Sequence, residues 1–144
     1  MATARTIPAR NGRVRVAIAA DLVLVGELLG AHGMTVADES LAARIAGDDC
    51  GILLGNRTTL SWTLDGGVIH VYDVAGAPDG LHALVVVVER IARERFVAVL
   101  ATTLAATDPA LPALTACGFE PEWIERDVVA GTVVELIDLV RIVR

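Results

Sequence analysis

The stretch GVIHVYDVAGAPDGLHALVVVVERIARER, residues 67–95, does most to decide the expected fold. Residues 68–74 alternate between apolar and other side chains, which is typical of a strand with one face in the core. The segment 75–80, AGAPDG, consists of turn-forming and small residues and predicts a loop. From Leu81 the apolar residues recur at helical spacing. The valines at 85–88 favour a strand, but the length of the segment and its charged last turn favour a helix.

The flanking sequence predicts further elements on both sides of this stretch. On the N-terminal side we expect a strand at 13–19, a helix from 22 that Gly30 or Gly33 can end, a helix at 36–46 capped by Thr35 or Asp38, and strands at 51–55 and 58–64. On the C-terminal side we expect a buried strand at 96–104, a short helix opened by Asp108 and Pro109 and closed at Gly118, and strands at 120–129 and 133–143.

Length and charge limit the classes of function. A chain of 144 residues fits one domain, which we place at 13–144 behind a flexible segment at 1–12. The net charge is −6, and the 12 basic residues, all arginine, are scattered, so we expect neither a nucleic-acid nor a membrane partner. The longest run without a charge, 96–107, is shorter than the roughly 20 residues that span a bilayer. No apolar export signal is evident near the start, so we expect a cytoplasmic protein.

The two cysteines and the high apolar content indicate how the chain packs and whether it assembles with another chain. Cys50 and Cys117 have no CxxC or Cys/His spacing, so we expect buried free thiols and no metal site. The mean hydropathy of +0.60 is high for a soluble monomer. Because large exposed apolar patches usually mark contact surfaces, we expect a homodimer or a protein partner.

The order of expected elements across 13–144 is β, α, α, β, β, β, α, β, α, β, β. This order, with RVRVAIAADLVLVGELLG at 13–30, GVIHVYDV at 67–74 and DPALPALTACGFEPE at 108–122, resembles the GNAT superfamily of N-acetyltransferases. The resemblance implies an α/β (α+β) fold with a mixed, mostly antiparallel central sheet of about seven strands flanked by about four helices. It also implies acetyl-CoA or another acyl-CoA as cofactor, and a small-molecule or protein amine as substrate.

The resemblance implies a cofactor site between the strand at 68–74 and the helix at Leu81. In that family, a loop with the pattern Gln/Arg-x-x-Gly-x-Gly/Ala holds the cofactor diphosphate with backbone N–H groups. Here Ala75 and Pro78 replace two pattern residues and only Gly80 is retained, while Asp79 adds a negative charge. Carried over by position, the expected cofactor-binding residues are Tyr72, Asp73, Val74, Gly76, Ala77, Gly80 and Leu81. Their role requires the amides between Gly76 and Leu81 to be free.

The resemblance also implies where acid and base should lie. Leu114 stands where the family usually has a tyrosine acid. We therefore take His70 as the candidate base and Tyr72, on the same face of its strand, as the second catalytic candidate. The alternatives are a His70 ring hydrogen-bonded between strands and a Tyr72 packed in the core with Trp62, with which it could otherwise line a pocket. Asp73 is expected on the opposite side of the strand.

The remaining histidines and Trp123 have simpler expected places. His32 is expected to interact with the last carbonyls of its helix, and His82 to be a solvated helix residue near the phosphate end. Trp123 fits either a dimer contact or the acceptor cleft.

Three functional hypotheses follow from these residues. The first is an acyl-CoA-dependent N-acyltransferase with a divergent cofactor loop. The second is a catalytically silent binding or regulatory module with the same fold. The third is a pocket that runs another reaction on a small molecule.

Overall fold

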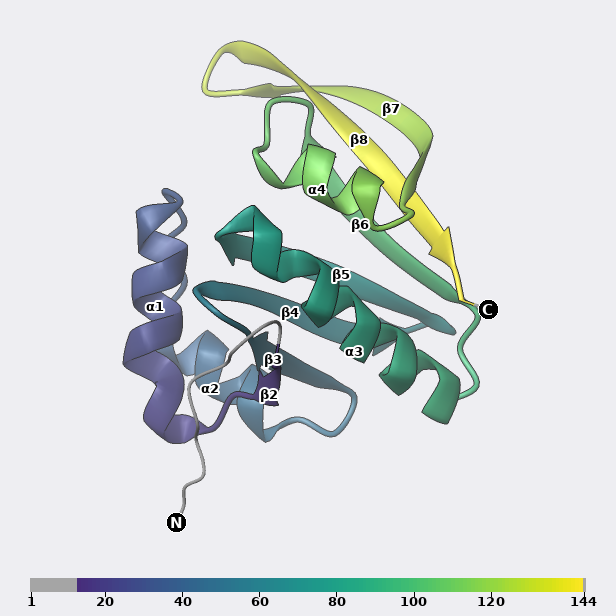
Figure 1. Cartoon of the computed structure of the whole chain (residues 1–144). Helices are drawn as coiled ribbons and strands as arrows, with labels where there is room; N and C mark the ends of the chain where they lie inside the picture. The colour runs from purple at the N-terminus through teal and green to yellow at the C-terminus, as the bar shows by residue number, and fades with distance from the viewer. Residues whose placement is uncertain (1–12, 144) are drawn as a thin grey trace.

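The computed structural model describes residues 13–143, which form one mixed sheet with helices on both faces (Figure 1). The sheet has seven strands in the order β2-β3-β4-β5-β6-β8-β7, and all neighbours are antiparallel except β5 and β6. The elements are β2 (Arg15–Val16), α1 (Leu22–Ala31), α2 (Asp38–Ala46), β3 (Cys50–Leu54), β4 (Thr58–Asp65), β5 (Val68–Gly76), α3 (Leu81–Glu94), β6 (Val99–Ala105), α4 (Ala110–Ala116), β7 (Glu120–Val129) and β8 (Thr132–Ile142), with short 3-10 helices η1 (Ala19–Asp21) and η2 (Pro78–Gly80). The expected fold class is confirmed.

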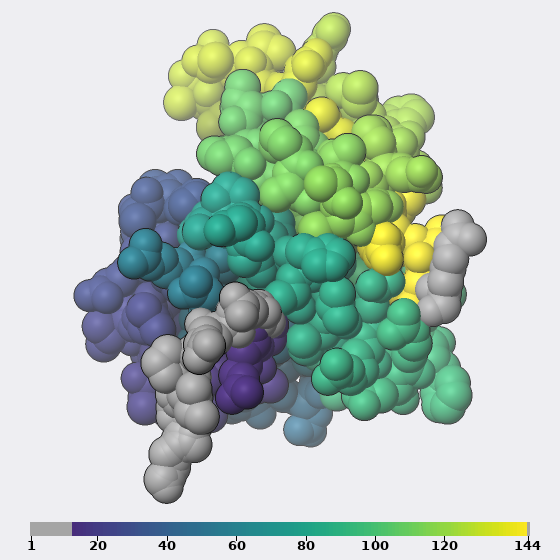
Figure 2. Space-filling view, in the orientation of Figure 1, coloured from purple at the N-terminus to yellow at the C-terminus, as the bar shows by residue number. Residues whose placement is uncertain are grey.

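Two apolar clusters hold the layers together, one on each face of the sheet. The larger cluster joins α3 and α4 to strands β3–β6 and includes Leu84, Leu100 and Leu114. The smaller cluster joins α1 and α2 to β3 and β5 and includes Leu29 and Leu41. In Figure 2 the teal atoms of α3 and the green atoms of α4 cover the near face of the sheet. In the described residues no helix packs on the opposite face of β6, β8 and β7, so that face is open.

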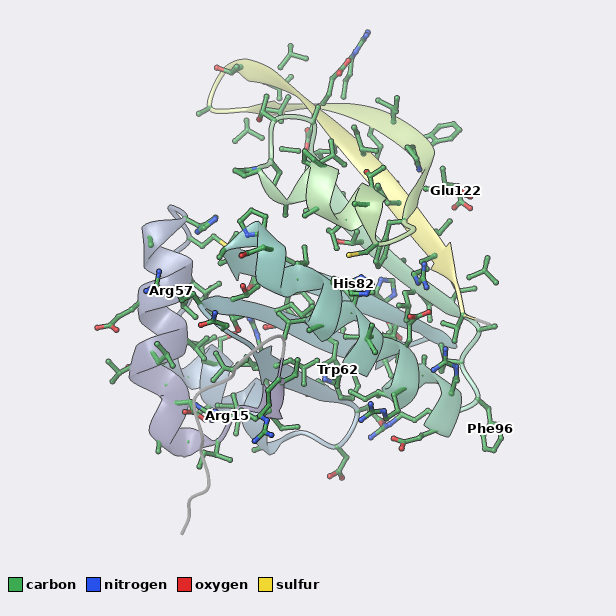
Figure 3. The ribbon with its side chains drawn as sticks, viewed as in Figure 1. Arg15, Arg57, Trp62, His82, Phe96 and Glu122 are labelled. Atoms are coloured by element: carbon green, nitrogen blue, oxygen red, sulfur yellow. The ribbon has the colours of Figure 1, made fainter. Side chains whose placement is uncertain are left out.

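Several predicted boundaries are wrong, each for a local reason. The strand expected at 13–19 is only two residues long, because Asp21 accepts hydrogen bonds from the Ile18 amide (2.8 Å) and the Arg15 guanidinium (2.7 and 2.8 Å) and so stabilises the turn η1. The strand expected from 96 begins at Val99. Phe96 has a positive φ of 58° and points away from the protein with 97% of its surface exposed (Figure 3).

The two predicted helix caps have different outcomes. At α2 the cap position is occupied by Ala37, so neither Thr35 nor Asp38 caps that helix. At α4 the cap position is occupied by Pro109, one residue later than predicted, but the Asp108 side chain still serves the helix start, because its Oδ1 accepts a hydrogen bond from the Ala110 amide at 2.8 Å.

The parallel pair β5–β6 positions the candidate site. Only three residue pairs join these strands, ending at His70 and Ala101, and beyond them the strands separate. On its other side β5 stays paired with β4 as far as Gly76, two residues past the predicted strand end. The register shift opposite Thr59 and Ser61, with Asp73 at φ 48°, marks a β-bulge. The edge of β5 that faces β6 is therefore open from Val71 onward.

Candidate functional site

The open face of the sheet carries a groove where β5 and β6 separate. Its volume is about 440 Å³, and its floor and walls come from four strands. The polar lining residues are His70 and Tyr72 from β5, Thr102 and Thr103 from β6, Glu122 from β7 and Asp138 from β8. The two catalytic candidates thus lie in one groove, as the alternation along β5 predicts.

Thr102 carries a buried hydroxyl without a partner. The residue is 4% exposed, and Oγ1 has no hydrogen-bond partner in the described part of the chain. A buried polar group without a partner costs about 1–3 kcal/mol, so Oγ1 is available to an ordered water or to a ligand. Thr102 follows Ala101, the last residue paired with β5, and by alternation its side chain shares the helix-covered face with Leu100 and Leu104, at the point where the strands begin to separate. No sequence pattern singles out Thr102, because threonine is common in buried strands.

Tyr72 is held by Arg44 of α2. The guanidinium carbon lies 4.7 Å from the centre of the Tyr72 ring, and Nη1 lies 2.8 Å from a carboxylate oxygen of Asp73 and 3.0 Å from Ser61 Oγ. Burial raises the pKa of Tyr72 above its usual 10.0, and the charge of Arg44 offsets part of this increase. The phenol is therefore protonated at neutral pH and able to donate a proton. The sequence did not single out Arg44, because an arginine in a short helix is usually a solvated surface residue.

Two expectations about the neighbours of Tyr72 are wrong. Asp73 reaches the same Arg44 as Tyr72, so it lies on the same side of the sheet, because the bulge interrupts the alternation of side chains. Trp62 lies on the opposite face, buried in the α3 cluster with the Arg95 guanidinium 5.4 Å from its ring (Figure 3). The two aromatics therefore do not line one pocket, and Trp62 is a core residue.

His70 is exposed in the groove. Within residues 13–143 its ring has no hydrogen-bond partner, so the alternative of a ring bonded between strands is wrong. Its Cα pairs with Thr63 of β4 and Ala101 of β6, which fixes its position at the point where the strands begin to separate. An exposed imidazole at the mouth of a groove can accept a proton from a ligand.

The end of the groove on β8 and β7 is acidic. Thr103 Oγ1 donates to Oδ1 of Asp138 at 2.6 Å, and Glu122 lines the same groove. The pKa of Glu125 is raised, because its carboxyl shares a hydrogen bond with Asp138 and is repelled by the charges of Asp138 and Asp127. Such a group of carboxylates favours cations. The sequence did not predict this group of carboxylates, because its members come together only through the register of β6, β8 and β7.

The segment expected to hold a diphosphate has its amides bonded within the protein. The Ala77 amide donates to the Arg57 carbonyl at 2.9 Å and the Gly80 amide to the Ala77 carbonyl at 3.2 Å. The Leu81 amide donates to the Pro78 carbonyl, and the Gly76 amide to Nδ1 of His32 at 3.4 Å. Pro78 has no N–H. The expectation of free amides between Gly76 and Leu81 is therefore wrong. His32 donates its amide to the Leu29 carbonyl of its own helix at 3.0 Å, as expected of a helix-end residue, and its ring also contacts this segment.

The glycines of this segment serve packing against β4. A Cβ on Gly76, which has φ +104°, would lie 2.0 Å from the Arg57 carbonyl oxygen, and one on Gly80 would lie 2.5 Å from Oγ1 of Thr58. The hollow that Gly76, Pro78 and Leu81 line together with His32 and Pro109 has a volume of about 10 Å³. That is room for about one water. A hollow of this size cannot enclose a diphosphate.

The other candidates have less to contribute. His82 is exposed in the first turn of α3, as expected. Leu114 is fully buried in the core, and Trp123 is exposed on β7 opposite Asp138. Both cysteines are free, Cys117 buried and Cys50 partly exposed, and residues 13–143 contain no cluster of three metal-binding side chains.

Comparison with known proteins identifies the architecture. No protein-family model matches the sequence, and no curated protein matches it significantly. Solved structures do match. The ribosomal-protein-S18-alanine N-acetyltransferase from Escherichia coli superposes with a TM-score of 0.72 at 17% identity, over 91% of this chain and 93% of that one. A GNAT-family protein from Desulfovibrio desulfuricans gives a TM-score of 0.72 at 16% identity, over 92% and 99%. The chain has the GNAT fold.

A third match connects the GNAT fold to a bound cofactor. The protein yncA from Salmonella typhimurium, solved with its cofactor acetyl-CoA, superposes with a TM-score of 0.73 at 16% identity, over 92% of this chain and 94% of that one. Such identities establish the architecture, while activity has to be argued from the groove itself. Among the described helices of this GNAT fold none is long and apolar enough to cross a membrane.

Proposed function

We propose that the chain is an N-acyltransferase that takes an acyl thioester, such as an acyl-CoA, into the opening between β5 and β6 and transfers the acyl group to an amine. The observation that carries the proposal is this opening, with an unpaired edge of β5 on one side and the unpartnered Thr102 hydroxyl on the other. The arm of a pantetheine thioester contains amide groups, which an open strand edge can pair with.

The residues of the groove suit the two proton transfers of such a reaction. When bound, the thioester supplies an activated acyl carbon. The ammonium form of the acceptor first releases one proton to solvent, and attack by the neutral amine then forms the C–N bond and breaks the C–S bond. The amine proton passes to His70, and the Tyr72 phenol, protonated because burial raises its pKa, donates its proton to the departing sulfur. The protonated His70 and the phenolate then exchange this proton through solvent, which returns both groups to their starting state. Arg44 acts as a positioning residue for Tyr72.

The acidic end of the groove suits the acceptor. Amines bind in their ammonium form at neutral pH, and Asp138 and Glu122 supply opposite charge close to His70. Trp123 lies opposite Asp138 across the β7–β8 pair and offers an aromatic surface to a cation. The acceptor class that fits this end is a cationic amine on a small molecule or a protein.

One observation favours a second candidate function, a catalytically silent binding module. The bonded amides of 76–81 remove the usual means of holding the coenzyme A diphosphate. A chain that has lost its donor and kept an acidic groove would bind a cationic partner without reacting with it. The donor-binding experiment separates the two functions.

The experiment compares Thr102→Val with Thr115→Val, a control on the exposed face of α4 whose hydroxyl bonds only the Leu111 carbonyl. Differential scanning fluorimetry is run with acetyl-CoA and with S-acetyl-pantetheine, each at about 100 times a micromolar Kd. Binding of that strength stabilises the fold by about 2.7 kcal/mol, or several degrees in Tm. Thr102→Val should raise the Tm of the free protein, because it removes an unpartnered hydroxyl, and should reduce the ligand-induced shift.

Two outcomes would count against the transferase. If neither thioester shifts the Tm of the unchanged protein at millimolar concentration, the silent module is the better assignment. If both thioesters bind but Thr102→Val and Thr115→Val behave alike, the donor does not lie in the β5–β6 opening. Release of free thiol in the presence of a panel of amines then tests turnover.

A further inference from the structure

The two ends of the expected donor site differ in what they offer to a ligand. The thioester end is an open groove of about 440 Å³, whereas the diphosphate end is a hollow of about 10 Å³. We infer that the chain recognises its donor through the pantetheine arm alone, so that the adenosine diphosphate of coenzyme A contributes little to binding. The inference rests on the proposed acyltransferase function and specifies its donor class as a pantetheine thioester that needs no nucleotide.

Hydrogen bonding argues against an anion site between β5 and α3. A diphosphate needs several N–H groups directed at it. Of the six positions 76–81, four donate their amide within the protein and a fifth is proline. The sixth is Asp79, whose carboxylate would repel a phosphate. Freeing the Ala77 amide would break its bond to Arg57, next to the last β4–β5 pair, Thr58 with Gly76.

Further contacts hold residues 76–81 against β4. Thr58 donates its hydroxyl to the Ala77 carbonyl at 2.6 Å, which ties β4 to the residue before η2. The Cβ positions of Gly76 and Gly80 are taken up by Arg57 and Thr58 of the neighbouring turn and strand. Both glycines are therefore needed for contact with protein atoms. The one retained pattern residue, Gly80, is explained without a phosphate.

The charge around residues 76–81 also argues against phosphate binding. The turn before α3 is exposed and carries Asp79, and the whole chain has a net charge of −6. Arg57 is the first cation to test as a phosphate partner, because its backbone carbonyl accepts the Ala77 amide and so places this residue beside the segment. Arg57 is exposed and has a positive φ of 60° in the turn between β3 and β4. It provides a direct test.

The test measures Kd for S-acetyl-pantetheine and for acetyl-CoA by isothermal titration calorimetry on the full chain. We expect the two values to agree within about threefold, and to respond equally to added salt, because no phosphate contact contributes to either. Arg57→Gln should leave the ratio of the two values unchanged. The matched control is Arg90→Gln, which removes an exposed charge from α3.

Three results would overturn the inference, and they are distinguishable. If acetyl-CoA binds about 100-fold more tightly than S-acetyl-pantetheine, the diphosphate is held after all. If Arg57→Gln weakens acetyl-CoA alone, with Arg90→Gln unchanged, the phosphate site lies at the β3–β4 turn. In both cases the acyltransferase proposal survives. If neither thioester binds at millimolar concentration, the proposed function fails and the donor assignment fails with it.

Discussion

Replacing Gly76 by alanine should destabilise the fold much more than the same change at Gly131. Both glycines have positive φ, +104° and +80° respectively, so both substitutions impose a backbone conformation that alanine avoids. They differ in their surroundings. A Cβ at 76 would lie 2.0 Å from the Arg57 carbonyl oxygen and 2.7 Å from Thr58 Cα, whereas a Cβ at 131 meets nothing within 4 Å.

The expected magnitudes follow from these distances. Backbone strain at a positive φ costs about 1–3 kcal/mol, and alanine recovers about 0.4–1 kcal/mol by restricting the unfolded chain. Gly131→Ala should therefore cost about 1 kcal/mol. At Gly76 the clash is with backbone atoms of β4, which cannot rotate away, and overpacking adds about 1–3 kcal/mol. We expect a loss of about 3 kcal/mol there, a large part of the 5–15 kcal/mol typical of a domain.

Urea unfolding monitored by tryptophan fluorescence, in which Trp62 passes from a buried to an exposed environment and Trp123 is exposed throughout, gives both free energies of unfolding. The slope of the transition should be the same in the two variants, since neither change alters the surface exposed on unfolding. If Gly76→Ala and Gly131→Ala agree within about 0.5 kcal/mol, the close contact of β5 with β4 at Gly76 is wrong. The explanation of the closed segment before α3 would then fail as well.

Further predictions concern charged and titrating groups. Arg15 lowers the pKa of Asp21 by hydrogen bonding, so this carboxylate stabilises the fold above its unfolded pKa of about 3.9, and the benefit is lost as the pH falls through the lowered value. Asp21→Asn should cost about 2 kcal/mol in urea unfolding at neutral pH and much less at acid pH. Tyr72 is the one tyrosine of the sequence, so ultraviolet absorbance of its phenolate should titrate above pH 10.0 in the folded protein and fall towards 10.0 in denaturant. Glu89 is buried with Arg141 at 2.8 Å, so Glu89→Gln should cost about 3 kcal/mol, whereas pairing it with Arg141→Met should cost less than the sum of the single changes.

Elements with a clear hydrophobic periodicity were predicted from the sequence with small errors in their boundaries. The helix expected from Leu81 is observed at Leu81–Glu94, because a stripe of apolar residues at helical spacing outweighs the strand preference of four valines. The last two strands surround the turn at Ala130 and Gly131, as predicted. In both cases the deciding information is local.

The errors come from contacts between distant parts of the chain. The alternation along 68–74 gives no sign of a bulge at Asp73, because the bulge depends on the register with β4 and on the charge of Arg44. The strand runs on to Gly76 because Thr58 pairs with it, which a reading of AGAPDG as a loop does not include. His70 and Tyr72 were correctly placed on one face of β5. Their acidic neighbours around Asp138 depend on the pairing of three other strands and were missed.

The three-pair seam between β5 and β6 has a mechanical consequence. On one side of it, β2 to β5 form a complete antiparallel ladder, and on the other side β6, β8 and β7 form a second one (Figure 1). Helix α3 packs across both ladders and acts as a backing layer. A small rotation about the seam would widen or narrow the groove without breaking a hydrogen bond inside either ladder. In the proposed acyltransferase, such a rotation would let the groove accept donors of different acyl bulk, with His70 close to the pivot.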